Sequence, residues 1–179
     1  MVKMTRCVAL SVALSTGFAL AQAPAGPPAP GPEHARLGYF VGTWASEGEV
    51  KPNPFMPAGK MTSNDTCAWF EGKYAVVCNY SGTSPMGPTK GLGIMSYSTE
   101  ERSYTYFGLD SGPMAMTTVP KGTVQGGSWV YVDESKMGGK MVKSRYSMKE
   151  LSPTAYTFKW EMMGEKGWET IIEGKTTKK

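Results

Sequence analysis

The sequence predicts an all-β protein, a single antiparallel up-and-down β-barrel of about ten strands that follows a short N-terminal helical turn. Runs of strand-forming residues alternate with turn signals about every ten residues, which is typical of sandwiches and barrels. No segment carries a long helical period. Because every connection is short, consecutive strands should pair antiparallel, and closing a sheet of this size removes its exposed edges.

The composition excludes several classes of site. The chain has 179 residues, the length of one domain or of one domain with a tail, with 22 Gly and 13 Pro, as in turn-rich β proteins. A single histidine excludes zinc sites with several histidine ligands. Three cysteines exclude a zinc or iron–sulfur site held by four cysteines of one chain. We expect no cofactor.

Residues 1–21 are predicted to be a secretory signal peptide. Lys3 and Arg6 supply the positive end, residues 7–18 supply a short apolar run, and Ala19-Leu20-Ala21 supplies the small-residue cleavage pattern. The apolar run is too short and too polar for a spanning helix. We therefore expect cleavage after Ala21, a secreted or periplasmic location, and no membrane insertion of the mature chain.

The mature chain would carry a net charge of +2, because residues 1–21 contain two of the 19 basic residues and none of the 15 acidic ones. Such a small and scattered charge does not favour a nucleic-acid partner. Residues 22–33 include five prolines and are expected to be a disordered linker. The barrel domain is expected at 34–179, with the helical turn at 34–40 and His34 exposed beside the linker.

The strands are bounded by residues that favour turns. Gly42 and Thr43 precede the first strand and Pro52 ends it. Pairs such as Gly126-Gly127 and Gly138-Gly139 separate later ones. The ten expected strands are residues 44–50, 61–70, 74–82, 89–98, 103–110, 114–119, 128–133, 141–151, 154–162 and 168–175.

Strict alternation of polar and apolar residues selects the inner face of the last three strands. In the middle strands, Tyr104 and Tyr106 alternate with Thr105 and Phe107, and the pattern does not choose between the two faces. By the same alternation Glu150 is almost the only inward carboxylate. The inward set of the last strands is expected to be Val142, Ser144, Tyr146, Met148, Tyr156, Phe158, Trp160, Met162, Trp168, Thr170 and Ile172.

Cys67 and Cys78 flank the turn Glu71-Gly72-Lys73. If Gly72-Lys73 is the loop, the two cysteines lie directly opposite each other. If Glu71-Gly72 is the loop, Cys78 is one diagonal step away from Cys67. Both registers place the cysteines on one face, so we predict a disulfide in an oxidising compartment.

Three stretches of the chain resemble the bacterial domain-of-unknown-function family 1579. They are LGYFVGTWASEGEV (37–50), the segment WFEGKY (69–74), which is similar to that family's W-x-x-G-G-x-F hairpin, and GLGIMSYSTEERSYTYFGLDS (91–111). The last is similar to its G-x-G-x-x-G-Y-D strand, with Ser96 in place of the usual Gly and Ser98 in place of Asp.

This resemblance implies a lipocalin-like barrel over roughly residues 34–177 and no established activity. In such barrels the tryptophan of the Gly-x-Trp opening closes one end, and Trp44 is expected to do the same. Nitrobindins share this opening and bind haem through a histidine in a late strand. Because this chain has no histidine after His34, haem ligation of that kind is not implied.

The favoured function is binding of a small hydrophobic or amphipathic molecule inside the barrel. Aromatic side chains and flexible methionines suit apolar ligands, and hydroxyl groups orient a polar head. The alternative is a packed structural or interaction barrel without an internal ligand. The candidate ligand-binding residues are Ser144, Tyr146, Met148, Tyr156, Phe158, Trp160, Trp168 and Thr170.

Two other functions have weaker support. Met114, Met116, the pair Met162-Met163 and His34 are candidate ligands for periplasmic Cu(I), since thioethers favour that ion. A hydrolase is disfavoured because Asp110-Ser111 lacks a nearby histidine for a triad. We expect a non-enzymatic protein, and the sequence does not specify its oligomeric state.

Overall fold

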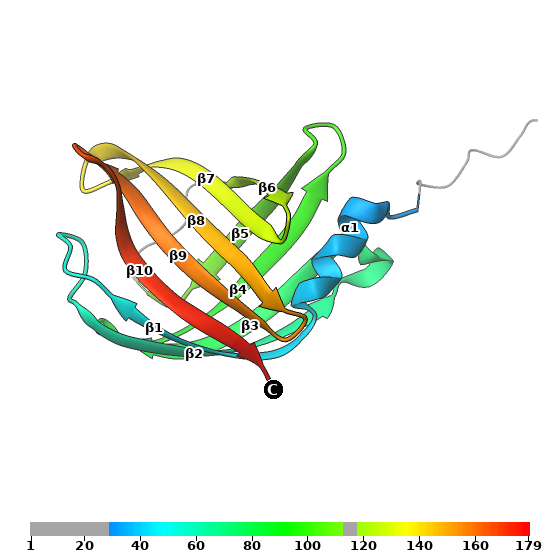
Figure 1. Ribbon diagram of the computed structural model, residues 1–179, viewed down its shortest axis with the longest axis horizontal. Coiled ribbons are helices and arrows are strands. Elements are labelled where there is room, and N and C mark those ends of the chain that lie inside the picture. Colours follow the sequence, from blue (N-terminus) through cyan, green and yellow to red (C-terminus); the bar gives the residue numbers. More distant parts are fainter. Residues whose placement is uncertain (1–28, 113–117) are drawn as a thin grey trace, which may run out of the picture.

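The computed structural model describes residues 29–112 and 118–179. Ten antiparallel strands close into a barrel in which each strand neighbours the next along the chain and β1 also pairs with β10 (Figure 1). The predicted all-β up-and-down barrel is therefore confirmed. The expected signal peptide, most of the expected linker and residues 114–117 of one expected strand lie outside the described residues.

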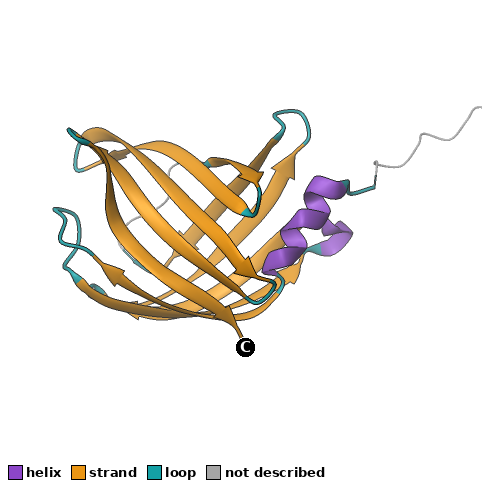
Figure 2. Cartoon of the chain, in the orientation of Figure 1, coloured by secondary structure: helices purple, strands orange, loops and turns teal. Residues whose placement is uncertain are grey.

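A short helical segment precedes the barrel and lies against one end of it (Figure 2). It comprises α1 (Pro32–Arg36) and the 3-10 turn η1 (Leu37–Phe40). No helix in the described part of the chain is long and apolar enough to cross a membrane. The strands are β1 (Gly42–Val50), β2 (Gly59–Trp69), β3 (Ala75–Ser84), β4 (Gly87–Ser98), β5 (Ser103–Asp110), β6 (Lys121–Gln125), β7 (Ser128–Met137), β8 (Lys140–Ser152), β9 (Ala155–Gly164) and β10 (Gly167–Lys178).

Nine of the predicted strands coincide with observed ones, but β6 differs. It lies at Lys121–Gln125, after the predicted segment 114–119. Its inward residues are Gly122, which the Tyr131 ring from β7 covers, and Val124, which packs against the core. One inward apolar side chain is too few to reveal an alternating pattern. The described ladder between β5 and β6 has only two residue pairs, Tyr104 with Gly122 and Thr105 with Lys121.

The predicted inner faces of β8 and β9 are confirmed. Tyr146 lies opposite Trp160, and Met148 lies opposite Phe158. For β5, which the sequence left open, the burial of Tyr104 and its place in the core show that the even-numbered residues face inward.

The predicted inward orientation of Trp168 and Thr170 is wrong. A β-bulge between Thr170 and Ile172 inserts one residue and reverses the alternation N-terminal to it. Thr170 consequently lies opposite the outward Glu161.

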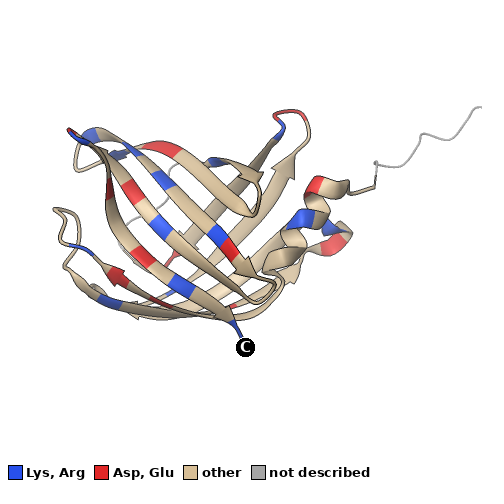
Figure 3. Ribbon diagram, viewed as in Figure 1, with Lys and Arg blue, Asp and Glu red and all other residues tan. Residues whose placement is uncertain are grey.

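Trp168 stacks on the outward Arg145, whose guanidinium carbon is 4.5 Å from the ring centroid. Arg145 donates hydrogen bonds of 2.6 and 3.0 Å to Glu161, and these bonds lower the pKa of that carboxyl group. Charged residues recur along β8, β9 and β10 (Figure 3), where this pair and Lys159–Glu173 join neighbouring strands. Trp168 therefore belongs to the outer surface.

The helical segment closes one end of the barrel through buried aromatic packing. Leu37 and Phe40 are fully buried against Trp44, which is 1% exposed and donates a 2.6 Å hydrogen bond from its indole to the Phe40 carbonyl. The Tyr39 hydroxyl lies 2.9 Å from the Ala155 carbonyl oxygen and so fastens the segment to the β8–β9 turn. These contacts agree with the structural role expected for Trp44.

The expected exposure of His34 is wrong. Its side chain is buried, because its imidazole packs edge-on against the rings of Tyr74 and Tyr97. Its Nδ1 accepts a 3.2 Å hydrogen bond from the Gly31 amide. His34 therefore helps to fix α1 on the barrel.

A disulfide joins Cys67 and Cys78, which lie directly opposite each other in the β2–β3 ladder. The predicted pairing is therefore confirmed, in the first of the two registers considered. Both cysteines share the inward face of the strands with Val76, which is fully buried.

We expect the double variant Cys67→Ala/Cys78→Ala to lose about 2–3 kcal/mol of unfolding free energy. The bond closes a short loop, and removing it restores conformational freedom to the unfolded chain. Urea titration of the variant and of the oxidised protein measures the difference. Reduced wild-type protein should match the variant, and a loss below about 0.5 kcal/mol would contradict this loop-closure account.

Candidate functional site

The candidate site lies inside the barrel and consists of five tyrosines around one aspartate. We call Tyr80, Tyr106, Tyr131, Tyr146 and Tyr156 the interior tyrosine cluster. The register places each of them on the inward face of β3, β5, β7, β8 and β9, respectively.

Asp65 on β2 shares the inward face with the cluster and lies directly opposite Tyr80 in the β2–β3 ladder. Its charge raises the pKa values of Tyr80, Tyr106, Tyr146 and Tyr156, although β2 neighbours only β3 among their strands. Burial is the first cause of all these shifts, and it raises the pKa of Tyr106 to about 12. The cluster hydroxyls therefore stay protonated and can donate or accept hydrogen bonds near neutral pH.

Burial also raises the pKa of Asp65, and a 2.9 Å hydrogen bond from the Ser63 hydroxyl partly offsets the effect. Among the described residues, Asp65 has no ion-pair partner. An ionised carboxylate in this position is therefore only partly stabilised by the protein itself.

Inward glycines let the aromatic rings lie against the wall. A methyl group at Gly93 would meet the Tyr106 hydroxyl at 2.9 Å, and one at Gly122 would meet the Tyr131 ring at 2.6 Å. The Tyr80 hydroxyl likewise lies against Gly91. The rings are thus held close to the backbone of β4 and β6 and away from the barrel axis.

Several enclosed side chains nevertheless keep accessible surface. Tyr106, Tyr146 and Trp160 point inward from neighbouring or facing walls, and each remains only half-buried. At the closed end, by contrast, Trp129 has no exposed surface. A ten-stranded barrel is wide enough to enclose more than its own side chains.

The residues predicted from the sequence divide into three groups. Trp160 is half-buried on the inner face outside the core cluster, and Ser144 is buried on the same face, opposite Asp133. Met148 and Phe158 belong to the packed core, and Tyr146 and Tyr156 are half-buried against it. Trp168 and Thr170 face outward, as described above.

Sequence reasoning missed Asp65, Tyr80, Tyr106 and Tyr131. The expectation that inward carboxylates are almost absent is also wrong, because Asp65, Asp110 and Asp133 all have inward register positions. The predicted disulfide could have revealed Asp65, since Asp65 lies two residues before Cys67 and therefore on the same face of the strand.

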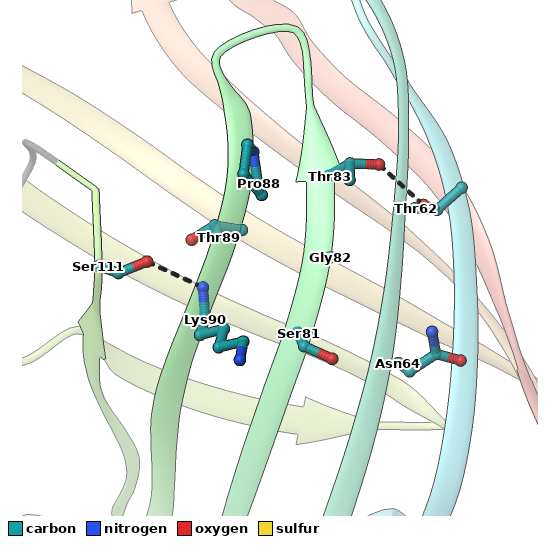
Figure 4. Close-up of a pocket in the computed structure, with 9 residues that line it drawn as sticks. All are labelled: Thr62, Asn64, Ser81, Gly82, Thr83, Pro88, Thr89, Lys90 and Ser111. Atoms are coloured by element: carbon teal, nitrogen blue, oxygen red, sulfur yellow. Dashed lines mark hydrogen bonds between the residues drawn. The ribbon is translucent and has the colours of Figure 1, made fainter.

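Two surface depressions lie outside this interior. One, of about 480 Å³, is on the wall formed by β2, β3 and β4, where the hydroxyls of Thr62 and Thr83 bond to each other at 3.2 Å and the Lys90 amide bonds to Ser111 (Figure 4). The other, of about 590 Å³, lies at the closed end beside Arg36 and Glu150. In both places the polar groups named here already bond to each other.

The copper hypothesis gains no support from the described residues. Met162 lies on the inner face of β9 and Met163 on the outer face, while Met114 and Met116 lie outside the described residues. Within residues 29–112 and 118–179, no group of three or more His, Cys, Asp or Glu side chains is placed to hold a metal ion.

The barrel is similar to solved structures of other proteins. An S-type phycobiliprotein lyase from Guillardia theta matches with a TM-score of 0.56 and 14% identity, over 82% of this chain and 92% of that chain. Rv2717c from M. tuberculosis matches with a TM-score of 0.58 and 11% identity, over 83% and 98%, respectively. At these identities the likeness shows the fold alone.

No curated protein matches this chain in sequence. A family model described as "Protein of unknown function (DUF1579)" matches residues 29–178.

Proposed function

We propose that this chain, which belongs to the DUF1579 family of proteins of unknown function, binds a small hydrophobic or amphipathic molecule inside its barrel. The observation that carries the proposal is the half-burial of Tyr106, Tyr146 and Trp160, which are enclosed by the barrel wall and yet keep accessible surface. Apolar walls with a few placed polar groups are the usual lining of small-molecule sites.

The two halves of the interior have different proposed roles. The closed end is packed by Phe40, Trp44 and Trp129 and forms a rigid floor. The half-buried residues above it supply ring faces for the apolar part of a ligand, and the cluster hydroxyls supply its polar contacts.

We further propose that the protein is exported after cleavage at Ala21, with residues 22–33 as a tether for the barrel domain. The signal-peptide pattern of residues 1–21 and the Cys67–Cys78 disulfide support this location, because disulfides persist in oxidising compartments.

Native mass spectrometry of protein purified from its own host tests the binding proposal. The expected result is an adduct of a few hundred daltons that an organic solvent removes, at about one copy per chain. Absence of an adduct, together with failure to bind the neutral dye Nile red, would overturn the proposal and support a packed barrel without an internal ligand.

Two tryptophan variants give a matched pair for the dye measurement. Trp160→Ala changes the inward wall of β9, whereas Trp168→Ala changes the outer surface of β10. We expect Trp160→Ala to weaken Nile red binding about tenfold, as removal of one ring contact implies. Trp168→Ala should leave it unchanged, and equal effects of the two variants would place the dye elsewhere.

A further inference from the structure

We propose that the molecule bound inside the barrel carries a positively charged amine, which Asp65 and the interior tyrosine cluster receive. This inference rests on the proposed function and specifies the chemical class of its ligand. It follows from the distribution of charge on the two faces of the barrel, from one unpartnered hydroxyl, and from the orientation of the aromatic rings.

The charge of the interior opposes that of the whole chain. The chain has a net charge of +4, but Asp65, Asp110 and Asp133 occupy inward register positions of β2, β5 and β7. Asp110 is exposed at the end of its strand, and Asp133 accepts a 2.7 Å hydrogen bond from Thr118. Among the described residues, the inward lysines lie near the barrel ends: Lys178 is over the Trp44 ring at 4.8 Å, and Lys140 begins β8.

Glu150, an inward carboxylate at the closed end, already has an ion-pair partner. It accepts a 2.5 Å hydrogen bond from the Arg36 guanidinium. Asp65 has no such partner in the described part of the chain, and burial disfavours its ionised form. A cation beside Asp65 would supply the missing partner and stabilise the carboxylate.

A second polar group on the inward face is buried without a partner. Tyr131 is 3% exposed, and its hydroxyl forms no hydrogen bond within the described residues. It lies on the inward face of β7, opposite Tyr146 on β8, and its ring is 6.5 Å from that of Tyr106. A buried hydroxyl without a hydrogen bond lowers the stability of the fold, and this hydroxyl oxygen could accept a hydrogen bond from an ammonium N–H.

The ring faces add a third attraction. Cations bind over the faces of tyrosine and tryptophan rings, most strongly where water is excluded. Tyr106, Tyr146 and Trp160 have inward register positions, and the Tyr106 ring lies so close to Gly93 that a methyl group added there would meet it. Carboxylate, hydroxyl and ring faces together form a receptor for an organic ammonium group.

The same arrangement opposes anionic ligands. A fatty acid would bring a carboxylate into an interior that already contains Asp65, with no described basic residue at mid-barrel to receive it. Repulsion of this kind contributes to specificity as much as attraction does. The interior should therefore rank ligands of equal chain length by charge.

Three probes of equal length test the ranking: decylamine, decanol and decanoate, each below its micellar concentration and measured by Nile red displacement at pH 7. We expect decylamine to bind at least tenfold more tightly than decanol, and decanoate to bind most weakly. Decanol binding equal to that of decylamine, or a preference for decanoate, would overturn the charge assignment alone. Failure of all three probes and of Nile red would overturn the proposed function.

Asp65→Asn tests the residue itself. Because the substitution removes a half-buried charge without an ion-pair partner, the variant should fold with equal or greater stability, bind decanol as the wild type does, and lose the preference for decylamine. Glu47→Gln on the outer face of β1 is the matched control and should keep that preference. If the preference survives in Asp65→Asn, Asp65 is not the receptor.

Tyr131→Phe provides an independent readout. It removes the unpartnered hydroxyl without changing the ring, so thermal stability should be unchanged or higher. We expect decylamine to bind several-fold more weakly to this variant, with decanol unaffected. Unchanged decylamine binding would show that the Tyr131 hydroxyl does not contact the bound amine.

Discussion

Replacement of Trp44 by alanine should lower the free energy of unfolding by about 3–5 kcal/mol, the largest effect expected in this protein. The indole is 1% exposed and packs against Tyr39 and Tyr156, with ring centroids 5.7 and 5.3 Å away. Its removal would leave a large cavity at the closed end. It would also leave the Phe40 carbonyl without the 2.6 Å hydrogen bond from the indole.

Urea unfolding followed by circular dichroism measures this loss. Trp44→Phe is the first control, because it keeps a ring in the cavity and should recover more than half of the stability. Trp160→Ala is the second, since Trp160 is only half-buried and should cost less than Trp44→Ala. If Trp160→Ala proves the more destabilising, the closed end is not the main core of the barrel.

Glu150→Ala should lower the unfolding free energy by about 2–3 kcal/mol, the second-largest expected effect. The Glu150 carboxylate accepts a 2.7 Å hydrogen bond from the indole of Trp129 and pairs with Arg36 at 2.5 Å. Trp129 has no exposed surface, so its N–H would be left buried and unpaired. The Arg36 side chain is 37% exposed, and its ion pair should therefore contribute the smaller part.

Glu150→Gln separates the two contributions. The amide oxygen can still accept from Trp129, whereas the ionic pairing with Arg36 is lost, so we expect a loss below about 1 kcal/mol. Added salt should weaken the wild type slightly and leave the Gln variant unchanged. Equal losses in the Ala and Gln variants would show that the ion pair, and not the indole hydrogen bond, carries the effect.

The sequence predicted the fold where alternation was strict. In β9, apolar and polar residues alternate from Tyr156 to Met162, and in β8 the outward positions from Lys143 to Lys149 are all polar or charged, so both inner faces could be predicted. In β10 the adjacent residues Ile171 and Ile172 fit either face, and the bulge between Thr170 and Ile172 reversed the assignment of Trp168. A bulge is set by strand pairing, and residue pattern alone does not reveal it.

The candidate site was harder to predict from the sequence than the fold, for the same reason. On β2, the inward Ser63 and Asp65 are as polar as the outward Thr62 and Asn64, so polarity does not distinguish the two faces. Gly122 of β6 is covered by Tyr131 from β7, which means that the neighbouring strand supplies the apolar surface. Both features depend on contacts across the sheet and not on local sequence.

The two-pair ladder between β5 and β6 has a kinetic consequence. Within residues 29–112 and 118–179, most other neighbouring strands pair over seven to ten residues, whereas β5 and β6 are joined by these two pairs and by the 3.3 Å hydrogen bond from the Tyr106 amide to the Pro120 carbonyl. Separating them therefore breaks fewer of the described hydrogen bonds than opening the barrel between most other strands. Local fluctuations concentrate where the fewest bonds must break. Tyr106 is the next residue of β5, so we expect a molecule bound as proposed to exchange on the timescale of opening at this junction, faster than global unfolding.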